Sequence, residues 1–322
     1  MEKKFDLVSM GEAVVEVFRK EVDVGMDVPG DFIGPYPSGA PAITVDTMAK
    51  LGGSCAYIAT VGQDDFGTCV KQRLKKDGVD VIGITKLKNK MTGIAFTNYF
   101  SNGDRKFIYN FTTAATAYLT PALIDKRVIL ASRWLHVSGN VLAFSKSARD
   151  AVIKAVKVAH KHDIPISLDP NIRLEIMDKR KLYHLLKPIL DRATVLLPSK
   201  GELNLIFGES KSDHEIIRTL LSGNVKTVVS KEGEAGSTAY TKEETVHADA
   251  FEGIDEVDPT GCGDAFCAGF IYGMLNRWGM MQTLKFANAV GAITATKKGA
   301  MEGVERLDEV KQFLSKRDIK IH

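Results

Sequence analysis

The chain has 322 residues, 44% of them hydrophobic and 26% charged, which is the usual balance of a globular protein with room for one large domain. Its 43 Lys and Arg residues and 40 Asp and Glu residues leave a formal net charge of +3, so the charge gives no reason to expect a nucleic-acid partner or an anionic membrane. No stretch approaches the roughly 18 uninterrupted apolar residues of a membrane span, and the four cysteines form no CxxC pair, so we expect a soluble cytoplasmic protein with reduced thiols.

The N-terminal part alternates between extended and helical patterns. Residues 5–18 predict a strand, a glycine break and a second strand. Residues 19–37, with three prolines and three glycines, predict an extended loop with short edge strands. Apolar residues at helical spacing predict helices over 39–52 and 67–78, with a short buried strand over 55–62 between them.

The stretch 92–112 has a different pattern. Two alternating runs rich in aromatic residues flank the sequence SNGD, and its Asn-Gly pair is a strong hairpin signal. An antiparallel hairpin inside an alternating chain suggests a flap outside the main sheet. We therefore expect a small β lid made from residues 12–36 and 92–112.

After the hairpin, strands and helices alternate again. Helices are expected at 146–163, near 178–191, and at 200–208, 263–279, 280–299 and 307–317, with short strands before and between them. This order predicts a mostly parallel central sheet with helices on both faces, a three-layer α/β/α arrangement. No internal repeat or linker divides the chain, so residues 1–322 are expected to form one domain with the lid inserted in it.

Residues 255–270, DEVDPTGCGDAFCAGF, place a glycine-rich turn before an apolar helix. Glycines allow consecutive N–H groups to converge at a helix N-terminus, where the helix dipole favours an anion such as phosphate. By itself such a turn is most often a helix start with an Asp N-cap, here Asp264. The spacing also matches neither a Walker A loop nor a dinucleotide-binding GxGxxG.

Other motifs in the chain make a functional role for this turn more specific. The stretch DPTGCGDAFCAGF resembles the signature of the PfkB/ribokinase family of sugar kinases, and residues 38–67 resemble the N-terminal signature of that family. Further segments, among them LDPNIR, PSKGEL and VVSKEGEAG, follow in family order, so the resemblance covers essentially the whole chain. The overall motifs are most similar to those of 2-keto-3-deoxygluconate kinases and fructokinase-like members. The resemblance implies a ribokinase-like fold.

The resemblance also implies ATP-dependent phosphorylation of a sugar hydroxyl. Asp264 would take the proton of the attacking hydroxyl, and the amides of Gly261, Cys262 and Gly263 would form the anion hole. The residues that match the ATP site of the family are Lys231, Gly233, Gly236, Asn288 and Gly299. For Asn288 the alternative is a buried amide that ties a helix to a loop.

Two metal ions follow from the same resemblance. Glu202 matches a glutamate that organises Mg²⁺ through water, although Ser199 stands where the family has Asn. Asp258 matches a position that helps to hold a monovalent cation, so K⁺ is a candidate second ion.

On the sugar side, Glu16 stands where the family usually has an Asp that binds sugar hydroxyls; the alternative is a solvent-facing Glu on an edge strand. The other residues implied in substrate binding are Gly39, Ala40, Tyr109, Asn110, Asn171 and Arg173. Ile43 stands at a position where the family has Asn, which removes one polar contact.

Asn110 stands where sugar-acid kinases carry a lid Arg, and a neutral amide cannot clamp a carboxylate. Arg173 could replace it, but fructokinase-like members carry a similar Arg. We therefore favour a neutral sugar or polyol, with a sugar acid or a nucleoside as alternatives. A nucleoside requires that part of the lid's aromatic stripe faces inward instead of forming lid core.

Two other classes remain open: a catalytically silent sugar- or nucleotide-binding regulator and a nucleotide-dependent oxidoreductase, against which the missing GxGxxG speaks. Because lids in this family often pair across a dimer, the hairpin is compatible with a homodimer but does not establish one.

Overall fold

A ten-stranded sheet forms the centre of the computed structural model, which describes residues 3–208, 210–304 and 306–319. The strands run in the order β14-β13-β12-β11-β10-β9-β1-β4-β5, and β6 also pairs with β4. Their bounds are β1 (Leu7–Glu12), β4 (Cys55–Gly62), β5 (Val79–Asp80), β6 (Ile84–Leu87), β9 (Leu135–Ser138), β10 (Ile166–Asp169), β11 (Val195–Leu196), β12 (Thr227–Lys231), β13 (Ser237–Tyr240) and β14 (Thr245–Ala248). The pairs from β5 to β12 are parallel, and only β13 and β14 add antiparallel pairs at one edge.

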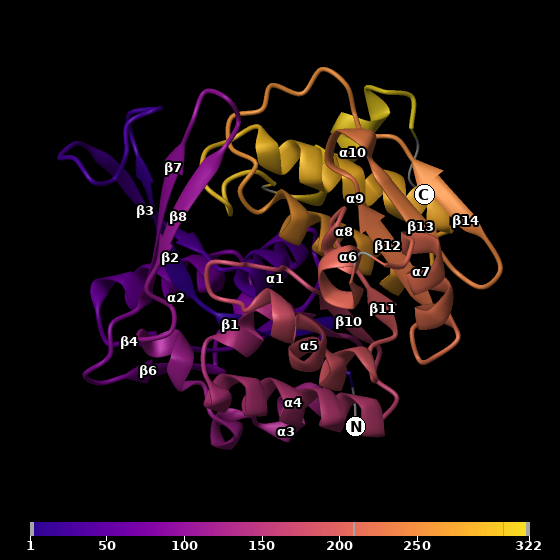
Figure 1. The fold of residues 1–322 in the computed structure, drawn as a ribbon, viewed down its shortest axis with the longest axis horizontal. Helices are drawn as coiled ribbons and strands as arrows, with labels where there is room; N and C mark the ends of the chain where they lie inside the picture. The colour runs from indigo at the N-terminus through magenta and orange to yellow at the C-terminus, as the bar shows by residue number, and fades with distance from the viewer. Residues whose placement is uncertain (1–2, 209, 305, 320–322) are drawn as a thin grey trace.

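Helices cover both faces of this sheet (Figure 1). Their bounds are α1 (Ala40–Lys50), α2 (Asp65–Lys76), α3 (Lys126–Leu130), α4 (Lys146–Lys161), α5 (Leu182–Leu190), α6 (Glu202–Phe207), α7 (Asp213–Leu221), α8 (Cys262–Leu275), α9 (Met280–Ala295) and α10 (Leu307–Ser315). Helices α3 to α7 share one hydrophobic core with the sheet, and α1, α2, α8 and α9 share the other. Along β1, Leu7 belongs to the second core while Val8 and Met10 belong to the first, as the two-residue period of a strand requires. The predicted three-layer α/β/α fold is confirmed.

The lid is a separate four-stranded sheet in the order β3-β2-β7-β8. It consists of β2 (Val14–Arg19), β3 (Phe32–Ser38), β7 (Gly93–Tyr99) and β8 (Arg105–Tyr109). Figure 1 shows these strands rising from one side of the molecule, apart from the central sheet. The β7–β8 pair is antiparallel, which confirms the predicted hairpin. Because β1 ends at Glu12 and β2 begins at Val14, a single residue, Ala13, joins the central sheet to the lid.

The sequence-based elements need two corrections. The break between the first two strands falls at Ala13, because Gly11 lies inside β1 with a φ of 148°. Helix α7 was not predicted, although Ser212 and Glu215 form a capping box at its start. Among the described residues, none of the helices is both long enough and apolar enough to cross a membrane.

Candidate active site

A cavity of about 260 Å³ lies between the lid and the carboxyl ends of the central strands. Glu12 ends β1, Asp169 ends β10 and Lys231 ends β12, and all three line the cavity. This is where ligands bind in open α/β sheets. The other polar and charged lining residues are Glu16, Ser38, Arg105, Tyr109, Asn140, Asn171, Arg173, Ser199, Glu202, Thr260 and Asp264.

Helix α8 presents its N-terminus to this cavity. Its N-cap is Gly261 at φ 83°, and a Cβ there would come within 3.0 Å of Ala300, so the turn requires glycine. Asp264 is the third helical residue, and no side chain caps the helix. The prediction that Asp264 is the N-cap is therefore wrong: one of its oxygens instead accepts a hydrogen bond from Asn171 Nδ2 at 3.3 Å.

The amides of this turn differ in what they contact. The Cys262 N–H donates to the Pro259 carbonyl at 3.3 Å. Within the described ranges, the N–H groups of Gly261, Gly263 and Asp264 have no hydrogen-bond acceptor. These orphan donors lie at the positive end of the α8 dipole, so they can receive an anion. The turn therefore has the unpartnered donors that the predicted anion hole requires, except at Cys262, whose amide is already hydrogen-bonded.

The Asp264 carboxyl has an unusual electrostatic environment. It is enclosed in the cavity wall, and this desolvation, followed by the negative charge of Asp169, raises its pKa to about 7. The positive charges of Lys231 and Arg173 act in the opposite direction. A carboxyl with this pKa can exchange a proton near neutral pH, as a general base must.

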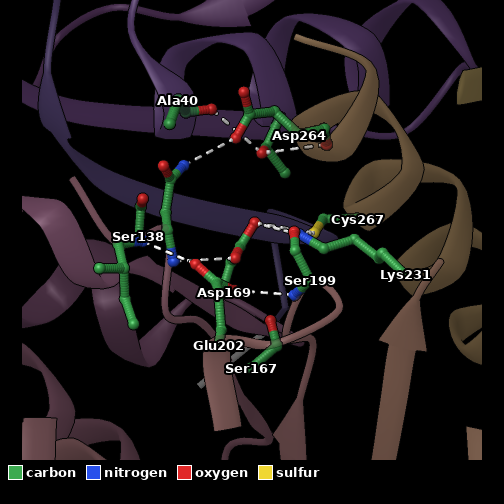
Figure 2. Close-up of polar contacts among 12 residues, drawn as sticks. Ala40, Ser138, Ser167, Asp169, Ser199, Glu202, Lys231, Asp264 and Cys267 are labelled. Carbon is green, nitrogen blue, oxygen red and sulfur yellow. Dashed lines mark hydrogen bonds and ion pairs between the residues drawn. The ribbon is translucent and has the colours of Figure 1, made fainter. Parts of the chain in front are cut away.

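Lys231 and Asp169 form a buried ion pair beside Asp264. Their Nζ–Oδ2 distance is 2.6 Å, and the side chain of Asp169 is 3% exposed. A Cβ on Gly263 would lie 3.5 Å from Lys231 Nζ, so the ammonium lies against the first turn of α8. Figure 2 shows Lys231, Asp169 and Glu202 converging, with Asp264 nearby. The sequence-based assignment placed Lys231 along ATP; in the structure it lines the same cavity as Asp264.

Glu202 is fixed by the backbone around it. One of its oxygens accepts from the Ile172 N–H and the other from the Ser199 N–H, both at 2.7 Å. Burial and the Asp169 charge raise its pKa. Among the described residues, no group of three His, Cys, Asp or Glu side chains forms a metal site. Because both of its oxygens already accept backbone hydrogen bonds, Glu202 fits a role in which a Mg²⁺ ion is held through its water ligands.

Glu16 lies in β2, with 3% of its surface exposed, so the alternative of a solvent-facing Glu is wrong. Its two oxygens accept from Ser38 Oγ at 3.1 Å and from Thr97 Oγ1 at 2.5 Å. Burial raises its pKa to about 7. Gly39 and Ala40, at the start of α1, line the same cavity.

Two lid assignments change. Asn110 does not line the cavity, because its side-chain oxygen accepts from the Ile94 N–H at 2.7 Å and ties β8 to β7. The lid nevertheless contributes an arginine from a different position: Arg105, at the start of β8, lines the cavity together with Arg173. The aromatic stripe divides, since Phe107, Tyr109 and Phe111 line the cavity while Phe96 and Tyr99 pack on Phe32 and Phe18.

Asp258 is fully buried and already has three donors. Its Oδ1 accepts from the Tyr99 hydroxyl and from the Thr260 N–H at 2.9 Å, and its Oδ2 accepts from the Gly299 N–H at 2.8 Å. It connects the lid, the glycine turn and the 299–302 loop. Asp258 therefore has a structural role as an anchor between these three segments.

The remaining ATP-site residues lie outside this cavity. The Asn288 amide donates to the carbonyls of Ala248 and Asp249 and accepts from Ser237 Oγ, so it ties α9 to β13 and to the end of β14, which was the structural alternative. Gly236 has a φ of 94°, and a Cβ there would lie 2.2 Å from the Ala248 carbonyl. Gly233 has open space around it.

The charged and amide residues of the cavity that were not singled out from the sequence are Glu12, Arg105, Asn140 and Asp169. Glu12 and Asp169 each end a parallel strand, and Asn140 follows the end of β9. A polar residue at or just after the carboxyl end of a buried parallel strand is the sequence signal that predicts Glu12, Asn140 and Asp169 as cavity residues.

Comparisons with known proteins agree with this geometry. Residues 4–307 match the family model described as "pfkB family carbohydrate kinase". The chain is 32% identical to "Probable fructokinase-4" of Arabidopsis thaliana over 96% of both chains. It is 28% identical to a 5-dehydro-2-deoxygluconokinase of Clostridium perfringens, covering 98% of this chain and 94% of that one. A crystal structure of a "putative Ribokinase II in complex with ATP and Mg+2" from E. coli superposes with a TM-score of 0.91 at 36% identity, over 98% of this chain and all of that one.

Proposed function

Since the chain belongs to the pfkB family of carbohydrate kinases, we propose that it transfers the γ-phosphoryl group of ATP to a hydroxyl of a small neutral sugar or polyol, with Asp264 as the base. Membership makes it an ATP-dependent sugar kinase, a phosphotransferase with an alcohol acceptor. The roles of individual residues and the sugar itself are what we propose. The observation that carries them is the Asp264 carboxyl, with a pKa of about 7, at the N-terminus of α8 in the cavity.

In this proposal Asp264 removes the proton of the attacking hydroxyl as the new O–P bond forms. The N–H groups of Gly261 and Gly263 hold the negative charge of the transferring phosphoryl, and the Lys231 ammonium against Gly263 adds a positive charge. Phosphoryl transfer depends mainly on positioning and charge stabilisation, which is what these groups provide. ATP supplies the phosphoryl group, and Mg²⁺ neutralises phosphate charge, with the fixed Glu202 carboxylate accepting hydrogen bonds from its water ligands.

The preference for a neutral sugar rests on two features. The Asn171 side-chain oxygen, which has no donor within the described residues, and the Glu16 carboxylate, whose oxygens keep lone pairs besides those used by Ser38 and Thr97, can accept from sugar hydroxyls. Phe107 and Tyr109 give one wall of the cavity an apolar face for the C–H side of a sugar. The relative with 32% identity carries the name fructokinase.

A sugar acid is the second candidate, and one specific observation favours it. Arg105 and Arg173 both line the cavity, and within the described ranges neither guanidinium has a hydrogen-bonded or ion-paired acceptor. Two such cations are suited to a carboxylate. The Clostridium relative, whose name is that of a sugar-acid-type kinase, is consistent with this candidate.

A coupled assay of ADP release over D-fructose, D-ribose, 5-dehydro-2-deoxygluconate, 2-keto-3-deoxygluconate and adenosine tests both candidates. For a sugar acid, Arg105→Ala should raise KM by about 10- to 100-fold, because it removes a charge-assisted contact worth about 1.5–3 kcal/mol. For a neutral sugar the change should be only a few-fold. Lys106→Ala, on the same strand outside the cavity lining, is the matched control. Tight sugar binding without turnover would instead indicate a regulator.

Three finer points belong to the same proposal. K⁺, where activity depends on it, would be held by backbone carbonyls near the glycine turn, since Asp258 is occupied. The enzyme would work in the cytoplasm, where ATP is available and its four free cysteines stay reduced. Two chains would pair through their lids, which light scattering of the purified protein would reveal as a doubled mass.

A further inference from the structure

Glu12 lies at the junction of the central sheet and the lid. It is the last residue of β1, it is 1% exposed, and it lines the same cavity as Asp264. Its own backbone carbonyl accepts a hydrogen bond from the buried Tyr57 hydroxyl. Nothing in the proposed mechanism uses this carboxylate so far.

One oxygen of Glu12 has a structural role. Oε1 accepts from the Ala40 N–H at 3.0 Å and from Asn140 Nδ2 at 2.8 Å. Ala40 is the first residue of α1, whose N-cap residue Gly39 has no side chain to offer. Oε1 therefore satisfies an orphan donor at the positive end of the α1 dipole, and the two hydrogen bonds fix the direction of the side chain.

The other oxygen has no partner. Within the described part of the chain, Oε2 is buried and no hydrogen-bond donor reaches it. A buried acceptor without a donor costs about 1–3 kcal/mol. Glu16 differs on this point, because Ser38 and Thr97 already donate to both of its oxygens. Of the two glutamates in the cavity wall, Glu12 is the one with an unpartnered carboxylate oxygen.

We propose that Glu12 is a specificity-determining residue whose Oε2 accepts a hydrogen bond from a hydroxyl of the sugar, a second hydroxyl besides the one that is phosphorylated. This inference rests on the proposed function, and it selects polyhydroxylated substrates over their monodeoxy analogues. A site that hydrogen-bonds a hydroxyl rejects the analogue that lacks it, because the buried polar group is then left unpaired.

Glu12→Gln separates this role from the capping of α1. The glutamine keeps a carbonyl oxygen for the Ala40 N–H and Asn140, but it places an NH₂ group, a donor, where Oε2 accepts. We expect a folded protein whose KM for the sugar rises at least 10-fold, while KM for MgATP stays within two-fold. An unchanged sugar KM in folded Glu12→Gln protein overturns the inference and leaves capping as the only role of Glu12.

The control is Asp46→Asn. Asp46 is a fully buried carboxyl on α1 whose pKa is also raised to about 7 by burial, but it is absent from the cavity lining. The Asp46→Asn variant should leave the KM for the sugar unchanged. That result would exclude a general effect on sugar binding of removing a buried charge. If Glu12→Gln does not fold, Glu12→Asp replaces it in the test. Aspartate keeps the negative charge, but its side chain is shorter by one methylene, so this variant should also raise the KM for the sugar.

Monodeoxy analogues give the second readout. The probe is the sugar with the highest kcat/KM in the panel above. The wild-type enzyme should discriminate against one of its monodeoxy analogues by at least 10-fold in kcat/KM, and Glu12→Gln should lose that preference. Equal discrimination in both proteins overturns the inference alone, since turnover by the wild type still supports the proposed function. If no panel sugar is bound or phosphorylated, the proposed function fails and the inference fails with it.

Discussion

The Asp264 carboxyl is subject to two opposing demands. As a base it must be ionised, yet enclosure in the cavity and the neighbouring Asp169 charge favour its protonated form. Lys231 and Arg173 partly restore the ionised form. The balance leaves a pKa of about 7, so the group carries a stability cost in the absence of substrate.

Asp264→Asn should therefore stabilise the unliganded protein at pH 8. The pKa of Asp264 is about 7 in the folded protein and near 3.8 when unfolded, so its penalty grows as the pH rises through that window and is complete above it. The neutral amide removes the penalty, and we expect a gain on the order of 1–2 kcal/mol in unfolding free energy, since the partly exposed site moderates the effect. Urea unfolding at pH 8 measures it, and a loss of stability would contradict this account of the pKa.

Asp169→Asn should move the acid limb of the kcat/KM profile. Asp169 raises the pKa of Asp264, and its removal also leaves the Lys231 charge uncompensated, which lowers that pKa further. The base then ionises at lower pH, by about one pH unit. A pH–rate profile of folded protein, checked by circular dichroism because a broken buried pair is destabilising, decides this; a shift towards higher pH is the contrary outcome.

For single residues, the sequence predicted which side chains line the cavity where those residues belong to a motif. The glycine turn, Glu16 and Arg173 could be placed from motifs, and the cavity contains all of them. Arg105 could not, because the register of β8 decides which lid residue faces inward. Asn110 and Asn288 show the converse: an amide that matches a motif position is occupied by backbone partners that only the fold reveals.

The side chain of Tyr99 connects the lid hairpin to the turn that precedes α8. The Tyr99 hydroxyl, in β7, contacts both Asp258 and Thr260, while its ring stacks on Phe18 at 6.0 Å. These contacts hold the lid against the turn that precedes α8. The same carboxylate also holds Gly299, so the contact reaches the loop that follows α9.

Tyr99→Phe should weaken this connection while keeping the ring packing. Asp258 would lose one of three donors in a buried site, which costs about 1–3 kcal/mol. We expect a lower melting temperature and a several-fold higher sugar KM. Tyr118→Phe is the control, since within the described residues the Tyr118 hydroxyl accepts only from Lys90, at the surface. Equal behaviour of the two variants would show that the lid does not depend on Asp258.

Elements were predicted well where periodicity was long. Helices α4, α8 and α9 and the lid hairpin lie where the patterns placed them. Helix α7 was missed although its capping box is visible in the sequence. Strands β13 and β14 form the antiparallel edge of the central sheet. This edge could not be predicted, because short alternating runs do not specify which strand they pair with or in which direction.

At the scale of the whole molecule, the parallel sheet brings together polar side chains from distant parts of the chain. Glu12, Asn140, Asp169 and Lys231 come from or follow the carboxyl ends of four strands and meet in one cavity. The protein also buries several carboxyls on other elements, and burial raises the pKa of Glu12, Glu16, Asp46 and Asp264 to about 7.

The unliganded protein should therefore be less stable at pH 7.5 than at pH 5.5. Each raised carboxyl binds a proton in the folded state that the unfolded state has released, so stability falls as the pH rises towards 7. Buried His136 opposes this only below about pH 6.5, because burial lowers its pKa to about 4. Chemical denaturation at the two pH values measures the difference; greater stability at pH 7.5 would show that these carboxyls are ionised without penalty.

The central claim, that Asp264 is the base of a sugar kinase, is tested most directly by sugar-dependent ADP release from wild-type and Asp264→Asn protein measured side by side. The account predicts turnover by the wild type, a loss of about 10²–10⁴-fold in kcat in the variant, and similar KM values for MgATP. Activity of the variant within a few-fold of the wild type would contradict it.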